Sequence, residues 1–147
     1  VSRGLGDVYK RQVRYSEGLA STTIDSDLIP RLIDEIPVIA VLATQANGDT
    51  IIKDAKELKV KESNRIQAVV DNLKRMGADI EELEDGMIIK GKRKLKGAKI
   101  STFNDHRIAM TFYIAGLICE SDVELDNTMC IDISFPGYFE LLNYLIK

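Results

Sequence analysis

The sequence predicts an α/β (α+β) fold, because segments with helical and with strand-like patterns alternate along the chain. Residues 64–76 repeat apolar side chains every three or four positions, which is the spacing of one buried helix face. Residues 49–53 form a short run rich in β-prone side chains and follow the turn dipeptide Asn47-Gly48. The two patterns together indicate strands that are connected by helices.

A weak internal repeat points to the same class. Residues 48–66 and 121–139 can be laid end to end without a gap. Each segment comes after an apolar helix and contains, in order, a strand, a turn, a short strand and the start of a new helix. Identities between the two copies are few, so the repeat is one of pattern rather than of sequence. We therefore expect one α/β unit to be used more than once.

The composition limits the function classes. The chain has 147 residues, of which 45% are apolar, and a formal net charge of −3. These values fit one domain, or a piece of a larger protein, and argue against disorder and against a dedicated nucleic-acid binder. The longest apolar run, 36–43, is too short to cross a membrane. Two cysteines, Cys119 and Cys130, make no disulfide scaffold, so the cytoplasm is the expected compartment. With one histidine in the chain, no metal site is expected.

The first predicted helix covers 35–46. Asp34 or Asp27 is expected to cap it, and Pro37 stands in its first turn, where proline is tolerated. The strand at 49–53 follows.

Residues 57–60 are expected to form a second short strand. Ser63 is a good N-cap for the helix at 64–76, and Gly77 is expected to stop that helix. Its predicted buried face consists of Ile66, Val69, Val70 and Leu73.

A hairpin is expected at 79–83 and 87–90, because the Asp-Gly pair between them favours a tight turn. The helix predicted at 106–119 is apolar on nearly every face and should be buried, with Asn104 or Asp105 as its N-cap. The remaining elements are strands near 100–103, 122–126 and 131–134 and a last helix at 136–146.

Charged residues gather at three predicted helix starts, namely Asp34-Glu35, 61–65 (KESNR) and 104–107 (NDHR). The first turn of a helix carries unpaired N–H groups and partial positive charge, which attract anions. An arginine there is unfavourable for the helix itself, so Arg65 and Arg107 invite a functional explanation. A guanidinium binds phosphate or carboxylate through two parallel hydrogen bonds, and the set therefore predicts a site for a small polyanion.

Each of these residues also has a purely structural interpretation. Arg65 can be a solvated residue paired with Glu62, and Glu62 can complement the helix dipole. Asp34 can be only an N-cap, and His106 only a satisfied first-turn histidine. The basic segment 90–99 is interpreted as a solvated loop, because no aromatic residue is interleaved for base stacking.

The same residues carry a resemblance to a known family. Residues 28–37 (LIPRLIDEIP), 58–66 (LKVKESNRI) and 104–110 (NDHRIAM) resemble the C-terminal part of 3-phosphoshikimate 1-carboxyvinyltransferase, also called EPSP synthase, and 134–139 (SFPGYF) also fits. The resemblance covers about 13–147. It implies repeated βαβαββ units of the enolpyruvyl transferase fold, of which this chain would be an incomplete part of a two-domain enzyme.

The resemblance also implies an activity. The family transfers the enolpyruvyl group of phosphoenolpyruvate to the 5-hydroxyl of shikimate 3-phosphate and releases phosphate, a step towards chorismate and the aromatic amino acids. It needs no metal or organic cofactor. The partners implied are these two small-molecule substrates, without nucleic acid or membrane, and the full-length enzyme is expected to be a monomer.

By similarity, the resemblance assigns roles to six residues. Asp34, Lys61 and Glu62 would be catalytic, Asp34 taking the proton of the attacking hydroxyl and Glu62 exchanging a proton near C3. A carboxylic acid with that role needs a raised pKa. Substrate contacts would come from Asp34, Glu57, Lys61, Arg65, His106 and Arg107.

Two positions depart from the pattern of some family members. Glu57 stands where those members carry an asparagine that touches shikimate 3-phosphate. Ile133 stands where they carry a lysine that binds phosphoenolpyruvate, so no role is assigned to it. Since the family's amino-terminal part supplies much of both substrate sites, we expect this chain to be inactive alone.

The ends of the chain and the competing functions complete the set of expectations. Residues 1–12 show no periodicity and are expected to be a non-native leader, or else a flexible native one, before the folded part at 13–147. The alternatives to the leading activity are UDP-N-acetylglucosamine 1-carboxyvinyltransferase, a non-catalytic anion-binding module and a silent gene fragment.

Overall fold

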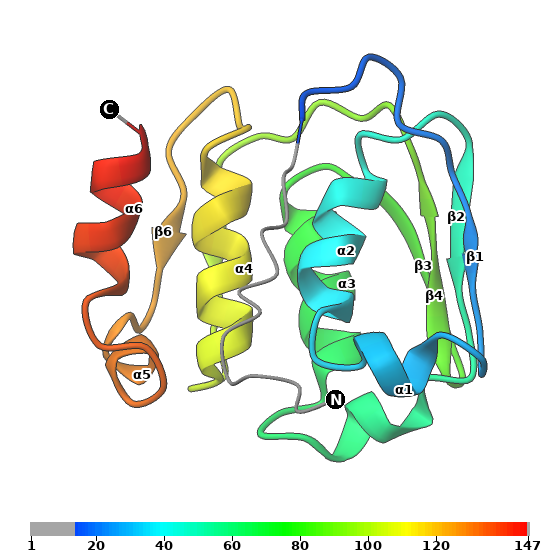
Figure 1. Cartoon of the computed structure of the whole chain (residues 1–147), viewed down its shortest axis with the longest axis horizontal. Helices are drawn as coiled ribbons and strands as arrows, with labels where there is room; N and C mark the ends of the chain where they lie inside the picture. The colour runs from blue at the N-terminus through cyan, green and yellow to red at the C-terminus, as the bar shows by residue number, and fades with distance from the viewer. Residues whose placement is uncertain (1–13, 147) are drawn as a thin grey trace, which may run out of the picture.

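The first part of the chain forms a βαβαββ unit. The structure is a computed structural model that describes residues 14–146. The unit has four strands in the order β1-β2-β4-β3, and they form one side of the molecule (Figure 1). The strands are β1 (Thr23–Ile24), β2 (Asp49–Ile52), β3 (Asp79–Leu83) and β4 (Gly86–Lys90). The connecting helices are α1 (Ile29–Leu32), α2 (Ile36–Ala43) and α3 (Arg65–Arg75). β1 and β2 are parallel, and the hairpin β3–β4 joins β2 antiparallel.

The second part begins another unit of the same kind. Two parallel strands, β5 (Lys99–Ile100) and β6 (Glu124–Leu125), are connected by α4 (His106–Gly116). The short α5 (Met129–Asp132) and then α6 (Tyr138–Ile146) follow. The predicted α/β (α+β) class with repeated units is therefore confirmed.

The spacing of the elements supports the repeat. Arg65 and Tyr138 are the first residues of α3 and α6. Ala43 and Gly116 are the last residues of α2 and α4, and they are separated by the same number of positions along the chain. A short helical turn precedes the second helix of each unit, namely η1 (Lys56–Val60) and α5. The pattern read from the sequence thus corresponds to two structurally related units.

Several local predictions are confirmed. All four residues of the predicted face of α3 are buried in the main core. Gly77 ends the helix with a φ of 85°, a left-handed conformation that glycine adopts without strain. The hairpin pairs Ile80 with Ile89 and closes at Leu83 and Gly86. Its turn consists of Glu84 and Asp85 rather than of the predicted Asp-Gly pair, because Gly86 already belongs to β4. α4 contributes Ile108 and Phe112 to the core, and both are fully buried.

Two predicted short strands are wrong, because both segments are helical. Residues 57–60 lie in the 3₁₀ helix η1, and 131–134 overlap α5. A strand must satisfy its backbone groups on a neighbouring strand, whereas a helical turn satisfies them locally. Accordingly Leu58 N–H donates to Ala55 C=O and Ile131 N–H to Thr128 C=O. The alternating apolar residues instead place Leu58 and Ile131 in the core.

The predicted caps also need correction. Glu35, not Asp34 or Asp27, is the N-cap of α2, and its side chain makes no capping hydrogen bond. Asn64, not Ser63, caps α3 by accepting from Gln67 N–H. The Asp34 and Ser63 side chains are instead bound to charged groups from other parts of the chain. Asp105 does cap α4, as predicted.

The helix ends differ from the predicted ones as well. α2 ends at Ala43 rather than at 46, and α4 ends at Gly116 rather than at 119, while α1 was not predicted. In the part of the chain that the structure describes, no helix has the length and apolar character needed to span a membrane. The expected leader at 1–12 lies outside the described residues.

Candidate active site

Three helices begin at the same end of the molecule. α2, α3 and α4 pack against one another, and their first turns lie towards the lower edge of Figure 1. Asp34 precedes α2, Arg65 opens α3 and His106 opens α4. Unpaired N–H groups and partial positive charge from several helices therefore meet in one region.

Arg65 is buried at the centre of this region, with a side chain only 1% exposed. Its Nε donates to Asp105 Oδ2 at 2.8 Å and its Nη1 to Asp34 Oδ1 at 2.9 Å. Its Nη2 donates to Glu62 and to Asp105 Oδ1. Burial alone would lower the pKa of Arg65, but the hydrogen bond and charge of Asp105 outweigh it, so the pKa is raised. The guanidinium therefore stays charged in the interior.

Asp34 links three cations. Besides Arg65, its carboxylate lies 3.8 Å from Lys61 Nζ and 3.9 Å from Arg107 Nη2. The Asp34 side chain is 44% exposed, so this acid lies at the boundary between the buried guanidinium and solvent. Helix starts far apart in the sequence are thus joined at one carboxylate.

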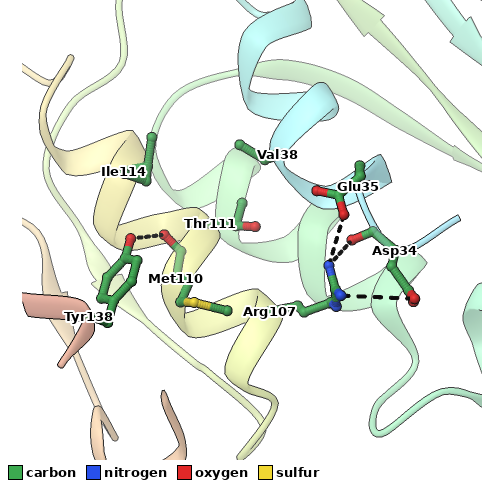
Figure 2. A pocket seen from close by; sticks show the side chains of 8 residues that line it. All are labelled: Asp34, Glu35, Val38, Arg107, Met110, Thr111, Ile114 and Tyr138. Carbon is green, nitrogen blue, oxygen red and sulfur yellow. Dashed lines mark hydrogen bonds and ion pairs between the residues drawn. The ribbon is translucent and has the colours of Figure 1, made fainter. Parts of the chain in front are cut away.

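Arg107 faces a cavity between α2 and α4 (Figure 2). Its Nη1 donates to the Asp34 carbonyl oxygen and to Glu35 Oε1, each at 3.1 Å. The cavity has a volume of about 240 Å³, with Asp34, Glu35 and Arg107 at one end and Tyr138 at the other. Its remaining lining residues are Val38, Met110, Thr111 and Ile114. The charged end holds one guanidinium and two carboxylates, and the walls are mainly apolar, so the cavity suits a small polar molecule with a carbon skeleton.

Lys61 joins Glu57 to the site. Lys61 Nζ donates to Glu57 Oε1 at 2.8 Å, an i, i+4 pair across η1 and the residue that follows it. This hydrogen bond is the main reason why the pKa of Lys61 is raised, and the charges of Glu57 and Asp34 act in the same direction. Lys61 is therefore held as a cation beside Asp34.

The structure thus brings most of the predicted site residues together. Asp34, Lys61, Glu62, Arg65 and Arg107 form one connected set of ion pairs, and Glu57 is attached through Lys61. His106 is half-buried at the start of α4 and belongs to none of the ion pairs among the described residues. The set is not one open pocket, because the cavity is lined by Asp34 and Arg107 while Arg65 is buried.

The sequence-based prediction missed two acids of this set. Asp105 was expected only as a helix cap, but it also binds Arg65 through both carboxylate oxygens. Glu35 was noted only for its charge, but it binds Arg107. The position of Asp105, directly before a histidine and an arginine at a helix start, is the one sequence signal that pointed to it.

The charges define the chemistry that is available. Two guanidinium groups and an ammonium group suit an anion with more than one charged oxygen, and the exposed carboxylates can exchange protons. Within 14–146, no three or more histidine, cysteine, aspartate or glutamate residues are grouped so as to hold a metal ion.

Comparison with known proteins gives a consistent picture. The family model described as EPSP synthase (3-phosphoshikimate 1-carboxyvinyltransferase) matches residues 6–142. The chain is 55% identical over 132 residues to the 3-phosphoshikimate 1-carboxyvinyltransferase of Oceanobacillus iheyensis, covering 90% of this chain and 31% of the relative. It is 54% identical over 147 residues to that of Listeria innocua, covering 99% of this chain and 34% of the relative.

A solved structure, EPSP synthase from Acinetobacter baumannii, matches with a TM-score of 0.82 and 40% identity. The match covers 86% of this chain and 30% of that one. The chain thus spans about a third of the length of the relatives that it matches.

Proposed function

Because the chain belongs to the EPSP synthase family, we propose that it forms part of an enzyme that transfers the enolpyruvyl group of phosphoenolpyruvate to the 5-hydroxyl of shikimate 3-phosphate. Phosphate is the second product. The activity is proposed for a complete enzyme, since this chain spans 31% to 34% of the length of its relatives. We expect that enzyme to be a monomer in the cytoplasm.

One observation carries the proposal, namely the position of Asp34 between Lys61, Arg65 and Arg107. Phosphoenolpyruvate has a carboxylate and a phosphate, and the two arginines suit these two groups. In this structure, carboxylates of the protein occupy the guanidinium donors. The anionic groups of the substrate would replace Glu35 on Arg107 and Glu62 on Arg65.

The proposed chemistry uses the two exposed acids beside the arginines. Glu62 gives a proton to C3 of phosphoenolpyruvate, and the shikimate hydroxyl forms a bond to C2 as its own proton passes to Asp34. The resulting tetrahedral adduct then returns a C3 proton to Glu62 as the C2–O bond to phosphate breaks, which restores the double bond in the product. Exclusion of water would strengthen the arginine contacts during these steps.

Three further residues have supporting roles in the proposal. Lys61 contacts both substrates next to Asp34, and its bond to Glu57 keeps it in place. Glu57 contacts shikimate 3-phosphate at the position where some members of the family carry an asparagine. His106 lies beside phosphoenolpyruvate at the start of α4.

The test is steady-state phosphate release. An enzyme completed with the missing portion of the Listeria innocua relative is expected to turn over, whereas the 147-residue chain alone stays near background. Asp34→Asn and Glu62→Gln in the completed enzyme should each lower kcat by about 10² to 10⁴-fold. Glu124→Gln, at an exposed acid of β6 paired with Lys99, is the matched control and should leave kcat unchanged.

Two outcomes would contradict the proposal. Turnover by Asp34→Asn and Glu62→Gln at the control rate would remove these acids from the mechanism. A completed enzyme that uses UDP-N-acetylglucosamine in place of shikimate 3-phosphate would assign the chain to the other transfer reaction.

A further inference from the structure

The guanidinium of Arg65 has two sides with different surroundings. Its Nε–Nη2 edge is bound by both oxygens of Asp105, a fully buried side chain. Its Nη1 and the other Nη2 proton face Asp34 and Glu62, whose side chains are 44% and 52% exposed. A dissolved anion can displace exposed carboxylates by side-chain motion, but it cannot reach the buried edge. One edge is therefore fixed and the other end is exchangeable.

Asp105 also connects the two arginines. In addition to Arg65, its carboxylate accepts from Ser63 Oγ at 2.9 Å and from the Arg107 backbone N–H at 2.9 Å. These donors come from the segment before α3 and from the first turn of α4. Orientation of the Arg65 side chain and placement of the Arg107 backbone thus depend on a single carboxylate.

The loop before Asp105 is held in an unfavourable conformation. Phe103 and Asn104 have φ values of 54° and 57°, which non-glycine residues rarely adopt. Thr102 anchors the loop by donating N–H and Oγ1–H to Asp126 Oδ1, at 2.9 and 2.6 Å. Strained backbone that persists between such anchors is typical of segments that position functional groups.

We propose that Asp105 is the positioning residue of the anion site, holding the inner edge of Arg65 and the start of α4 so that the outer guanidinium end is preset for a phosphate or carboxylate. This rests on the proposed function for the identity of the ligand class. Asp105 itself is not proposed to touch the ligand, because its side chain is fully buried and both of its carboxylate oxygens already accept hydrogen bonds from the protein.

The test uses the 147-residue chain, NMR of the arginine Nε–H groups and inorganic phosphate as the probe. In the unmodified chain, the Arg65 Nε–H should exchange slowly with water, and phosphate should shift the Nη signals of Arg65 and Arg107. Asp105→Asn should speed Nε–H exchange and weaken phosphate binding by about tenfold, because an unfixed guanidinium must be ordered by the ligand. Asp79→Asn, at a carboxylate that pairs with Arg93 and is 42% exposed, is the matched control and should leave the Arg65 exchange rate unchanged.

A folded Asp105→Asn chain with unchanged Arg65 exchange would overturn the inference. If that variant does not fold, Ser63→Ala removes a single donor to Asp105 and should speed the exchange by about 3- to 10-fold; no change there would overturn it equally. If phosphate shifts no arginine signal in the unmodified chain, the proposed anion site fails, whereas the exchange rates measured without phosphate still decide the role of Asp105.

Discussion

Arg65 and Arg93 make ion pairs of nearly equal length in opposite surroundings. Arg65 Nη1 lies 2.9 Å from Asp34 Oδ1, and Arg93 Nη2 lies 2.9 Å from Asp79 Oδ2. The Arg65 side chain is 1% exposed and the Arg93 side chain is 50% exposed. An exposed pair is screened by water and contributes little, whereas a buried charge that loses its partner has no water to replace it. The two arginines therefore differ in burial and not in the length of their ion pairs.

This difference predicts unequal costs of the same substitution. Arg65→Leu should lower the free energy of unfolding by about 3–5 kcal/mol, because the buried Asp105 carboxylate loses its charged partner. Arg93→Leu should cost no more than about 1 kcal/mol. Urea denaturation of both variants checks this, and similar midpoints would contradict the buried position of Arg65.

Asp105 should also shape the acid side of the stability curve. Burial alone would raise the pKa of this carboxyl, but the hydrogen bond and charge of Arg65 lower it below the ordinary value. A group whose folded-state pKa is depressed stabilises the fold fully above its unfolded-state pKa and progressively less as the pH falls through the folded-state value. The free energy of unfolding should therefore fall below about pH 4.

The matching variant is Asp105→Asn. This variant should be less stable than the unmodified chain at neutral pH. Its free energy of unfolding should fall less steeply below about pH 4, because the asparagine amide does not titrate. Chemical denaturation at a series of pH values measures both slopes, and parallel curves would show that Asp105 is not responsible.

At the scale of elements, the first residue of β4 lies so close to β2 that it has no room for a side chain. A Cβ added at Gly86 would lie 1.9 Å from the Ile52 carbonyl oxygen, a distance that only backbone displacement can relieve. Gly116, at the end of α4, has only ordinary contacts with the side chain of Val123. The glycine at the hairpin is thus required by packing, and the one in the helix is not.

Alanine at these two positions should therefore act in opposite directions. Gly86→Ala should destabilise the chain by about 1–3 kcal/mol through strain in the β2–β4 pairing. Gly116→Ala should be neutral or stabilise it by up to about 1 kcal/mol, since alanine favours helix. Thermal unfolding monitored by circular dichroism distinguishes the two, and equal midpoints would contradict the close approach.

At the scale of the whole molecule, one side-chain amide connects the two units through hydrogen bonds. Asn72 on α3 is fully buried; its Nδ2 donates to the Ser101 carbonyl oxygen at 2.8 Å, and its Oδ1 accepts from Ser101 N–H at 3.1 Å. Ser101 directly follows β5, so these bonds connect the first unit to the second. Loss of the amide leaves a backbone donor and acceptor without partners.

Asn72→Ala should therefore lower the free energy of unfolding by about 1–3 kcal/mol and loosen mainly the second unit. Hydrogen exchange provides the measurement: the Asp126 amide, bound to Ile100 C=O, should lose protection more than the Ile51 amide, bound to Thr22 C=O. Gln67→Ala, at an exposed amide on the same helix, is the control. Equal loss of protection at both amides would mean that the Asn72 hydrogen bonds do not connect the units.

The parts of the fold that follow from local pattern could be read from the sequence. The helix α3, the hairpin β3–β4 and the capped start of α4 depend on side-chain periodicity and turn residues within a few positions. Arg65 and Arg107 were recognisable because a helix start does not favour a cation. Segments 57–60 and 131–134 were misread, since whether a short apolar segment becomes strand or helix depends on a neighbouring strand.

Tertiary structure decided how the charges are paired. Arg65 and Asp105 are 40 residues apart, and no local pattern could show that the arginine is buried or which acid holds which edge. Likewise Glu35 and Arg107 are 72 residues apart and meet only because α2 packs on α4. Periodicity is a property of neighbouring residues, whereas burial and ion-pair partners are properties of the packed chain.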